Sequence, residues 1–375
     1  MSPSVSNDGI PRWANVVALP LVNLVAAFLV SGLVVLIIGE NPLEVVKLLI
    51  WGAFGFQEAI GYTLFYTTNF IFTGLAVAIA FHCMLFNIGG EGQAYIGGLG
   101  ITLVGLNLGF LPPIVLVPLC IIGGGLFGAA WAFIPAYLQA KRGSHIVITT
   151  IMFNFIASSL MVYLLVNVFI QPGSMQPESR YFHEAAIPFF HEALGWFGIK
   201  FASSPWNLSF LWAILCAAFV WVFVWHTRWG FELRTVGTNP RAADYAGISS
   251  TRNIIITMCL SGALAGFLGL NEIMGYNHRL LLNFSGGYGF VGIAVALMGR
   301  SHPLGVCLAA LLFGALYQGG AELSFEIPTI TRELVIVIQG LVIIFAGALE
   351  FMFKPQVEAV FRWFAPRKSR AAVAE

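Results

Sequence analysis

Long apolar runs constrain what this chain can fold into more than any other feature. The first run, residues 16–38, contains no charged side chain, and similar runs recur as far as residue 353. A helix needs about 20 mostly apolar residues to cross a bilayer. Only 9% of the 375 residues are charged, whereas soluble domains contain about 25%, so a water-soluble enzyme is excluded. Because the period-2 alternation of a membrane barrel is absent, the sequence predicts an all-α polytopic membrane protein.

About ten segments are apolar enough to be transmembrane helices. Two of them, 92–108 and 286–299, are the weakest candidates because they are short or rich in glycine. The ten predicted spans are 16–38, 60–82, 92–108, 113–138, 146–170, 207–226, 253–274, 286–299, 304–321 and 333–353.

The distribution of basic residues indicates the orientation of these spans. With ten crossings and both termini in the cytoplasm, 13 of the 18 Lys and Arg residues lie on the cytoplasmic side, as the positive-inside rule requires. We therefore expect a cytoplasmic N-terminus at 1–15, a transmembrane domain at 16–353 and a basic cytoplasmic tail at 354–375.

Three connections are long enough to form structure of their own. Segment 39–59 begins with Asn41 and Pro42 and has helical apolar spacing, which predicts an external helix on the membrane interface. Segment 171–206 contains four prolines and predicts an external cap. The third, about 228–250, lies on the cytoplasmic side. No ATP-binding GxxxxGK[ST] motif occurs in the sequence.

Two glycine-rich interruptions form a weak internal repeat of two halves. Residues 87–93 and 283–289 both follow the pattern Asn-x-(x)-Gly-Gly-x-Gly, and each precedes a short span. Matching interruptions in two halves of a transporter point to its translocation site. Glu91 strengthens this interpretation, because a carboxylate within a membrane helix is costly unless it is solvated or paired.

These interruptions and the polar residues near them supply the candidate substrate pathway. Its residues are Asn87, Glu91, Gln93, Asn154, Asn283 and Tyr288. The alternatives are hydrogen bonding between helices for the amides and exposure to cytoplasmic water for Glu91. For the Gly124–Gly128 and Gly262–Gly266 pairs we expect close helix packing instead. A path lined by amides and aromatic rings would suit an uncharged polar solute with a ring.

Other classes of site have little support in the sequence. The five cysteines lie inside apolar segments, and no pair has the spacing of metal ligands. Neither a metal site nor a cofactor is expected on this chain. The net charge of +1 gives no reason to expect nucleic acid binding.

The cytoplasmic segment contains a predicted short helix. Asn239 and Pro240 are typical of a helix start, and Gly247 of a helix end. A solvated loop is the alternative.

Three motifs resemble one family of membrane proteins. Residues 230–248 follow the pattern Gly-x-x-Leu-Arg-x-Val-Gly-x-Asn-x-x-Ala-Ala-x-x-x-Gly-Ile. This pattern resembles the coupling segment of ABC importer permeases of the branched-chain amino acid, ribose and nucleoside type. Residues 86–93 and 292–300 are similar to the nucleoside branch, and the resemblance covers about 60–350.

This resemblance implies a permease subunit that forms the translocation path for nucleosides or related polar ring solutes, and not an enzyme. Its expected partners are an ABC ATPase that carries ATP and Mg²⁺, a second permease in a heterodimer, an external substrate-binding protein, and the bilayer of a bacterial inner membrane. The residues expected to couple it to the ATPase are Arg234, Gly237, Asn239, Ala242, Ala243 and Gly247. A ribose-type sugar permease is the nearest alternative, followed by an amino acid permease, a stand-alone secondary transporter and a membrane enzyme.

Overall fold

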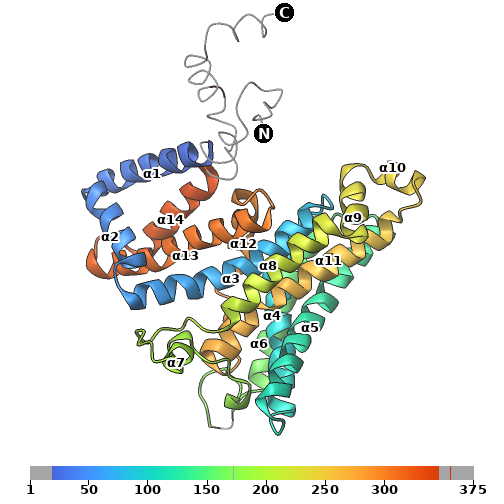
Figure 1. Ribbon diagram of the computed structural model, residues 1–375, viewed down its shortest axis with the longest axis horizontal. Coiled ribbons are helices and arrows are strands. Elements are labelled where there is room, and N and C mark those ends of the chain that lie inside the picture. Colours follow the sequence, from blue (N-terminus) through green and yellow to red (C-terminus); the bar gives the residue numbers. More distant parts are fainter. Residues whose placement is uncertain (1–18, 172, 346–354, 356–375) are drawn as a thin grey trace, which may run out of the picture. The chain divides into compact units, whose positions relative to one another are not determined.

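Helices account for all the regular structure in the described part of the chain. The computed structural model describes residues 19–345, apart from 172, and residue 355. Within these residues β pairing is limited to two isolated bridges, Glu178–Leu281 and Phe189–Asn207. The all-α class is therefore confirmed (Figure 1). The predicted cytoplasmic N-terminus, 1–15, and nearly all of the predicted tail, 354–375, lie outside the described residues.

Each predicted span corresponds to a helix at nearly the same residues. The elements are α1 (Leu19–Ile38), α2 (Pro42–Phe54), α3 (Gln57–Phe81), α4 (Gly90–Asn107), α5 (Pro113–Arg142), α6 (Ile146–Asn167), η2 (His183–Ala185), α7 (Phe190–Gly195), α8 (Ser209–His226), α9 (Arg228–Thr238), α10 (Pro240–Tyr245), α11 (Ser250–Gly266), η3 (Leu270–Asn277), α12 (Tyr288–Met298), α13 (Pro303–Glu326) and α14 (Arg332–Ile343). The end of the predicted span 333–353 lies outside the described residues.

Six of these helices are long and apolar enough to cross a membrane. They are α3, α5, α6, α8, the continuous run of α11 and η3, and α13. Parts of α1 and α2 form a pair bent by 116°, which would make a seventh span if the pair crosses once. The two weakest candidates form α4, with 18 residues, and α12, with 11. Ten crossings and the cytoplasmic location of both termini stay predictions.

The described residues divide into two compact units. The described residues of the first unit are 19–49, 320–345 and 355, and those of the second are 50–319 apart from 172. In the first unit α1 packs on α14, with a small core of Val35, Val45, Leu323, Ile330, Val335 and Ile338. The Thr329 hydroxyl donates a hydrogen bond of 2.5 Å to Glu40 at the start of the turn before α2.

The second unit is built around α3. Along the most apolar part of α3, 83% of the residues are buried, whereas only 28% are buried in α6. α3 is therefore the central helix, and α6 presents most of its apolar surface outward. α8 and α11 both pack against α3, and α5 packs against α11 (Figure 1).

Glycine allows α5 and α11 to approach at backbone distance. A Cβ at Gly128 would collide with the carbonyl oxygen of Gly262, and a Cβ at Gly266 would collide with that of Gly124. The packing role expected for these four glycines is confirmed. α4 joins the same contact, because a Cβ at Gly97 would collide with Gly266. Small residues permit such contact where lipid supplies no hydrophobic driving force.

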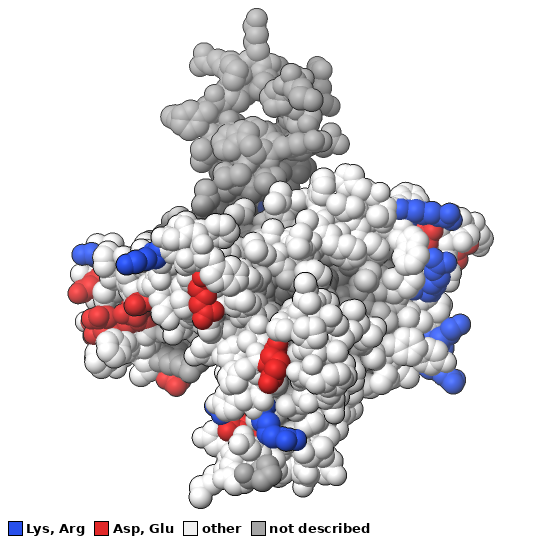
Figure 2. Space-filling view, turned by 60° about the horizontal axis from the view of Figure 1, so that its bottom comes forward, with Lys and Arg blue, Asp and Glu red and all other residues white. Residues whose placement is uncertain are grey.

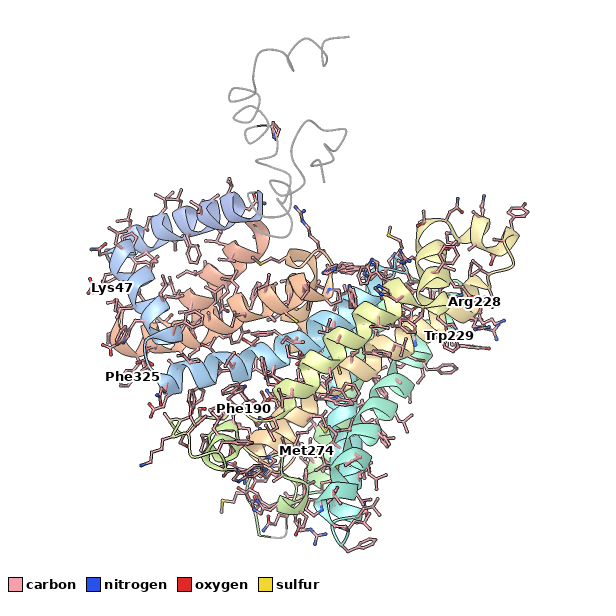
Figure 3. All side chains as sticks on the ribbon, in the orientation of Figure 1. Lys47, Phe190, Arg228, Trp229, Met274 and Phe325 are labelled. Carbon is pink, nitrogen blue, oxygen red and sulfur yellow. The ribbon has the colours of Figure 1, made fainter. Side chains whose placement is uncertain are left out.

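The second unit has two distinct ends. At one end, here called the coupling end, lie α9 and α10, where Arg228 and Trp229 are labelled (Figure 3). The other, the cap end, contains segment 171–206 with η2 and α7; Phe190 belongs to it, and Met274 of η3 lies toward it. Lys and Arg side chains gather at the coupling end, and a largely uncharged surface separates them from the charges at the cap end (Figure 2).

Candidate functional site

The chain turns back into the bundle immediately before α4. Asn87 donates hydrogen bonds to Gln93 Oε1 (2.9 Å) and to Ser261 Oγ (2.8 Å). Ser261 in turn donates to the carbonyl of Ala76 at 2.5 Å. Since Ser261 lies well inside α11 and Ala76 inside α3, Asn87 is placed among the spans and not beyond their ends.

Asn154 of α6 fixes the same turn from the other side. Its Oδ1 accepts a hydrogen bond from Gly92 N at 2.9 Å, and its Nδ2 donates to the carbonyl of Ile88 at 2.9 Å. Unpaired backbone groups are costly inside a membrane. Asn154 and Asn87 therefore satisfy the backbone that the glycine-rich break frees.

A second irregular segment, residues 278–287, leads into α12. His278, Asn283, Gly286 and Gly287 all have positive φ values, between 51° and 81°. This left-handed backbone turns the chain back from the cap end. At the cap end, His278 accepts a hydrogen bond from Phe182 N (3.0 Å) and Leu280 accepts one from Ser179 N (3.0 Å).

The two irregular segments, before α4 and before α12, meet at Glu91. Its carboxyl group accepts hydrogen bonds from Ser285 Oγ (2.5 Å), Gly287 N (3.0 Å) and Gly289 N (2.8 Å). Glu91 lies in the first turn of α4, and the two glycines are the cap and second residue of α12. The carboxyl group therefore lies at two helix N-termini, whose dipoles favour negative charge.

From this joint the two helices run in opposite directions. α4 ends near the cap, where a Cβ at Gly105 would come within 2.8 Å of the Phe182 ring. α12 leads to Ser301, whose carbonyl lies 3.0 Å from His82 Nε2 at the coupling end of α3. Two interrupted spans with opposed directions and facing N-termini form the arrangement that transporters place around a substrate site.

All six predicted pathway residues lie around this joint, but in two groups. Asn87, Glu91, Gln93 and Asn154 are buried, with hydrogen-bond partners inside the chain. Asn283 is exposed, and its Oδ1 accepts a hydrogen bond from the Tyr95 hydroxyl at 2.7 Å. Tyr288 is half-buried against Phe70, with ring centroids 5.5 Å apart. In this conformation the first group supports the backbone, and the second presents surface that a solute could reach.

Sequence reasoning missed a buried polar network on η3. Glu272 Oε1 accepts a hydrogen bond from Asn69 Nδ2 at 2.6 Å, and Asn277 Nδ2 lies 3.5 Å from Glu272 Oε2. Asn271 Nδ2 donates to Asn69 Oδ1 at 2.8 Å, and Asn271 Oδ1 accepts from Asn207 and Ser209 at 2.9 Å. η3 is a π-helix of eight residues, an element that is rare and frequent at functional sites. The signal in the sequence was Glu272 itself, a carboxylate within an apolar span.

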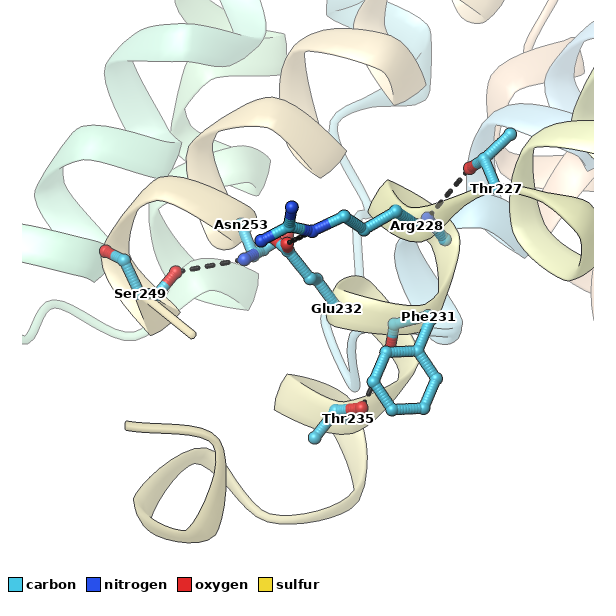
Figure 4. A network of polar contacts seen from close by, with 8 residues as sticks. Thr227, Arg228, Phe231, Glu232, Thr235, Ser249 and Asn253 are labelled. Atoms are coloured by element: carbon cyan, nitrogen blue, oxygen red, sulfur yellow. Dashed lines mark hydrogen bonds and ion pairs between the residues drawn. The ribbon is translucent and has the colours of Figure 1, made fainter. Parts of the chain in front are cut away.

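The predicted coupling segment folds into two helices. α10 begins at Pro240 as expected, Asn239 Oδ1 accepts a hydrogen bond from Ala242 N (3.1 Å), and Gly247 follows the helix with φ 75°. The structure adds α9, which the sequence did not predict as a helix. Thr227 caps α9 by accepting from Gly230 N (3.1 Å), and Arg228 pairs with Glu232 at 3.1 Å (Figure 4).

The predicted coupling residues differ in how they are placed. Ala243 of α10 is fully buried, whereas Ala242 and Asn239 are exposed. Tyr245, which sequence reasoning passed over, is 95% exposed. Arg234 Nε lies 3.4 Å from the carbonyl of Gly230 in the same helix. Tyr245 and Ala242 are thus on the exposed surface of α10, whereas Ala243 faces the rest of the chain.

Gly237 connects α9 to the end of α3. A Cβ there would collide with the carbonyl oxygen of His82 and lie 3.0 Å from Cys83 Cα. A larger residue at this position would separate the two helices.

A hollow of about 320 Å³ opens at the cap end. Its walls come from the end of α4 and from the cap, and include Asn107, Phe110, Arg180, Tyr181 and Glu184. Arg279 extends this surface: it pairs with Glu178 at 2.9 Å and lies over the Tyr181 ring at 4.5 Å. Among the described residues, no group of three or more His, Cys, Asp or Glu side chains could hold a metal ion.

The helical bundle and its two interrupted segments, whose helices α4 and α12 meet at their N-termini, define a multi-pass membrane protein of the transporter class. The chain belongs to the family described as branched-chain amino acid transport system / permease component, which matches residues 59–347. Members of this family are permease subunits and not enzymes, and ATP hydrolysis takes place on a separate subunit.

Three relatives match nearly the whole chain. The guanosine ABC transporter permease protein NupP of Bacillus subtilis is 34% identical over 88% of this chain and 92% of its own length. The nucleoside ABC transporter permease protein NupB of Lactococcus lactis is 33% identical over 92% of this chain and 94% of its own length. The glucose ABC transporter permease protein TsgB13 of Haloferax volcanii is 33% identical over 94% of this chain and 92% of its own length. No solved structure matches the chain.

Proposed function

We propose that this chain is the membrane subunit of an ATP-driven importer of nucleosides. The observation that carries the proposal is the match of 33–34% identity to NupP and NupB over most of each chain. The structure supports it in one respect: Glu91 joins two helix N-termini inside the bundle, as expected near a translocation path. Because these relatives are ABC permeases, a stand-alone secondary transporter is no longer a candidate function.

The wider assembly follows from the same family. Permeases of ABC importers work with an ATPase and a binding protein. We infer that the ATPase docks at α10, where Tyr245 protrudes, and that the binding protein docks at the cap end. The further expectations are a second permease in a heterodimer, a bacterial inner membrane, ten crossings and both termini in the cytoplasm. The gathering of basic side chains at the coupling end supports that orientation (Figure 2).

Glucose import is the second candidate. TsgB13, a glucose permease, is as similar to this chain as NupB is. Family membership alone therefore does not separate a nucleoside from a hexose.

The decisive experiment is uptake by the complete complex in proteoliposomes. The permease pair, the ATPase and the binding protein are reconstituted with ATP inside, and labelled guanosine, uridine, glucose and leucine are offered separately. We expect ATP-dependent uptake of the nucleosides and none of leucine. Uptake of glucose alone would establish the second candidate and reject the first.

A further inference from the structure

A continuous group of aromatic rings covers one side of α3. Tyr66 packs against Tyr288 of α12 and Tyr317 of α13, with ring centroids 6.2 and 5.7 Å apart. Phe70, one turn further on, lies 5.0 Å from Tyr317. Toward the cap end, Phe65 lies 5.4 Å from Tyr276 of η3. Four elements distant in the sequence thus contribute rings to one surface.

Four of the chain's ten tyrosines lie on this surface, and none of the four is fully buried. Tyr276 is 46% exposed, and the other three are half-buried. We call Tyr66, Tyr276, Tyr288 and Tyr317 the tyrosine face. The phenylalanines behind them, Phe65, Phe70 and Phe313, are buried and form its support.

The position of this face along the helices is unusual for tyrosine. Tyrosines of membrane proteins concentrate at the headgroup level. Tyr66 and Tyr317 lie instead in the middle parts of α3 (Gln57–Phe81) and α13 (Pro303–Glu326). Tyr288 begins α12 at the Glu91 joint.

The backbone beside the face also argues against lipid contact. Gly286 is exposed against the Tyr288 ring, and both Gly286 and the exposed Asn283 of the same irregular segment have a left-handed backbone. Irregular backbone at membrane depth is tolerated where it lines a water-filled cavity or contacts protein, but not against lipid. The tyrosine face therefore borders a cavity or another subunit.

The chemistry of the face favours an uncharged solute with a planar ring. Two carboxyl groups lie behind it, but Glu91 and Glu272 are both buried and accept hydrogen bonds from neighbouring groups. A passing solute would meet mainly aromatic rings. Nucleobases stack on aromatic side chains, whereas a hexose offers no planar ring.

We propose that the tyrosine face lines the substrate route and selects nucleosides over simple sugars by stacking against the base. This inference rests on the proposed function and adds the surface that determines substrate class. A second permease would supply the opposite wall.

The test compares leucine substitutions on and off the face. Tyr66→Leu and Tyr276→Leu remove two rings from it. Tyr137→Leu on α5 and Tyr163→Leu on α6 are matched controls, because these tyrosines are 40% and 61% exposed on other helices. In proteoliposomes, each face variant should raise the KM for guanosine by about tenfold, the size expected from losing one stacked base. The controls should leave the KM unchanged.

The conservative variants separate ring from hydroxyl. Tyr66→Phe and Tyr276→Phe keep the ring, so they should retain most guanosine uptake if stacking is the cause. Each variant is checked for co-purification with the ATPase. Face variants that assemble and behave like the controls would overturn the proposal, whereas a wild-type complex that imports no nucleoside would overturn the proposed function itself.

Photolabelling provides a measurement that needs no variant. Wild-type complex is irradiated with 8-azidoguanosine, and the labelled peptides are mapped. Label at or beside the four tyrosines, competed by guanosine and not by glucose, supports the proposal. Label confined to α5 and α6, or label that guanosine does not displace, contradicts it.

Discussion

At the scale of single residues, the most consequential group is the carboxyl group of Glu91. It links the first turns of α4 and α12 through three hydrogen bonds, from one hydroxyl and two backbone amides. Its partners lie almost 200 positions away in the sequence, so the link holds two halves of the chain together. The hydrogen bonds of Glu91 therefore indicate first a structural role, holding α4 and α12 together, and only then a role in binding the substrate.

Replacing Glu91 with Gln should destabilise the joint. The amide keeps the size of the side chain but turns one acceptor into a donor, which would face a backbone N–H of α12. A buried hydrogen-bonding group left without its partner costs about 1–3 kcal/mol. We expect thermal unfolding of the purified permease at a lower temperature and reduced uptake. Glu58→Gln, which changes an exposed carboxylate in the first turn of α3, should leave both unchanged. An unaltered unfolding temperature for Glu91→Gln would show that the carboxyl group does not hold the helices.

His82 should make the coupling end sensitive to acid. It follows α3, and its Nε2 lies 3.0 Å from the Ser301 carbonyl, which the neutral ring can reach as a donor. Burial lowers the pKa of His82 below its ordinary value of 6.5; the hydrogen bond to the Ser301 carbonyl offsets part of this effect, and the charges of Arg234 and His302 lower the pKa further. Below pH 6.5 the unfolded chain therefore binds a proton that the folded chain does not, so stability falls as pH falls until the folded pKa is reached.

The expected result is a measurable pH slope that a substitution removes. Unfolding of the purified permease is followed between about pH 7.5 and pH 5.5, the range in which this histidine can titrate. His82→Gln can still donate toward Ser301 but does not titrate, so its stability should fall less with acid than that of the wild type. Identical slopes would assign the acid sensitivity to other groups.

At the scale of elements, local signals in the sequence were enough for most helices but not for their contacts. Apolar runs located the long helices, Asn239-Pro240 located α10, and paired glycines predicted close helix packing within α5 and α11 but not that these two helices contact each other. Each of these signals is local or periodic. The Glu91 joint and the Asn69–Glu272 bond leave no local or periodic signal in the sequence, because they connect positions about 200 residues apart. The π-helix η3 was also missed, since no residue pattern distinguishes it from the α-helix that it extends.

The close contact of α5 and α11 gives a prediction about glycine. Gly262→Ala adds one methyl group that would collide with the Gly128 carbonyl and lie 2.6 Å from Ala132 Cβ. The helices must then separate, and overpacking of this kind costs about 1–3 kcal/mol. Gly195→Ala in α7 is the matched control, because nothing lies within 4 Å of its added methyl group. The unfolding temperature should fall for Gly262→Ala and not for Gly195→Ala. Equal unfolding temperatures for the two variants would mean that the helices adjust without cost.

At the scale of the whole transport unit, one set of contacts runs from the coupling end toward the tyrosine face. α10 is held to the start of α11 by Asp244 and Ser250, whose side chains are 2.9 Å apart. α9 touches the end of α3 at Gly237, and α3 carries Tyr66. A rigid movement of α9 and α10 would therefore act directly on the helix that bears the proposed substrate surface. Rigid elements of this kind suit the alternating states of a transporter.

This arrangement predicts that docking of the ATPase and its coupling to transport can be separated. Tyr245→Ala removes an aromatic ring of α10 that is 95% exposed and should weaken co-purification of the ATPase. Gly237→Leu leaves α10 unchanged but forces the end of α3 away from α9, because even a Cβ collides with the His82 carbonyl there. That variant should still bind the ATPase, while ATP hydrolysis loses its stimulation by the loaded binding protein and uptake falls. Thr238→Leu, at the exposed neighbouring position, should affect neither property. If Gly237→Leu keeps full stimulation, movement at α10 must reach the tyrosine face by a route other than the contact of α9 with α3.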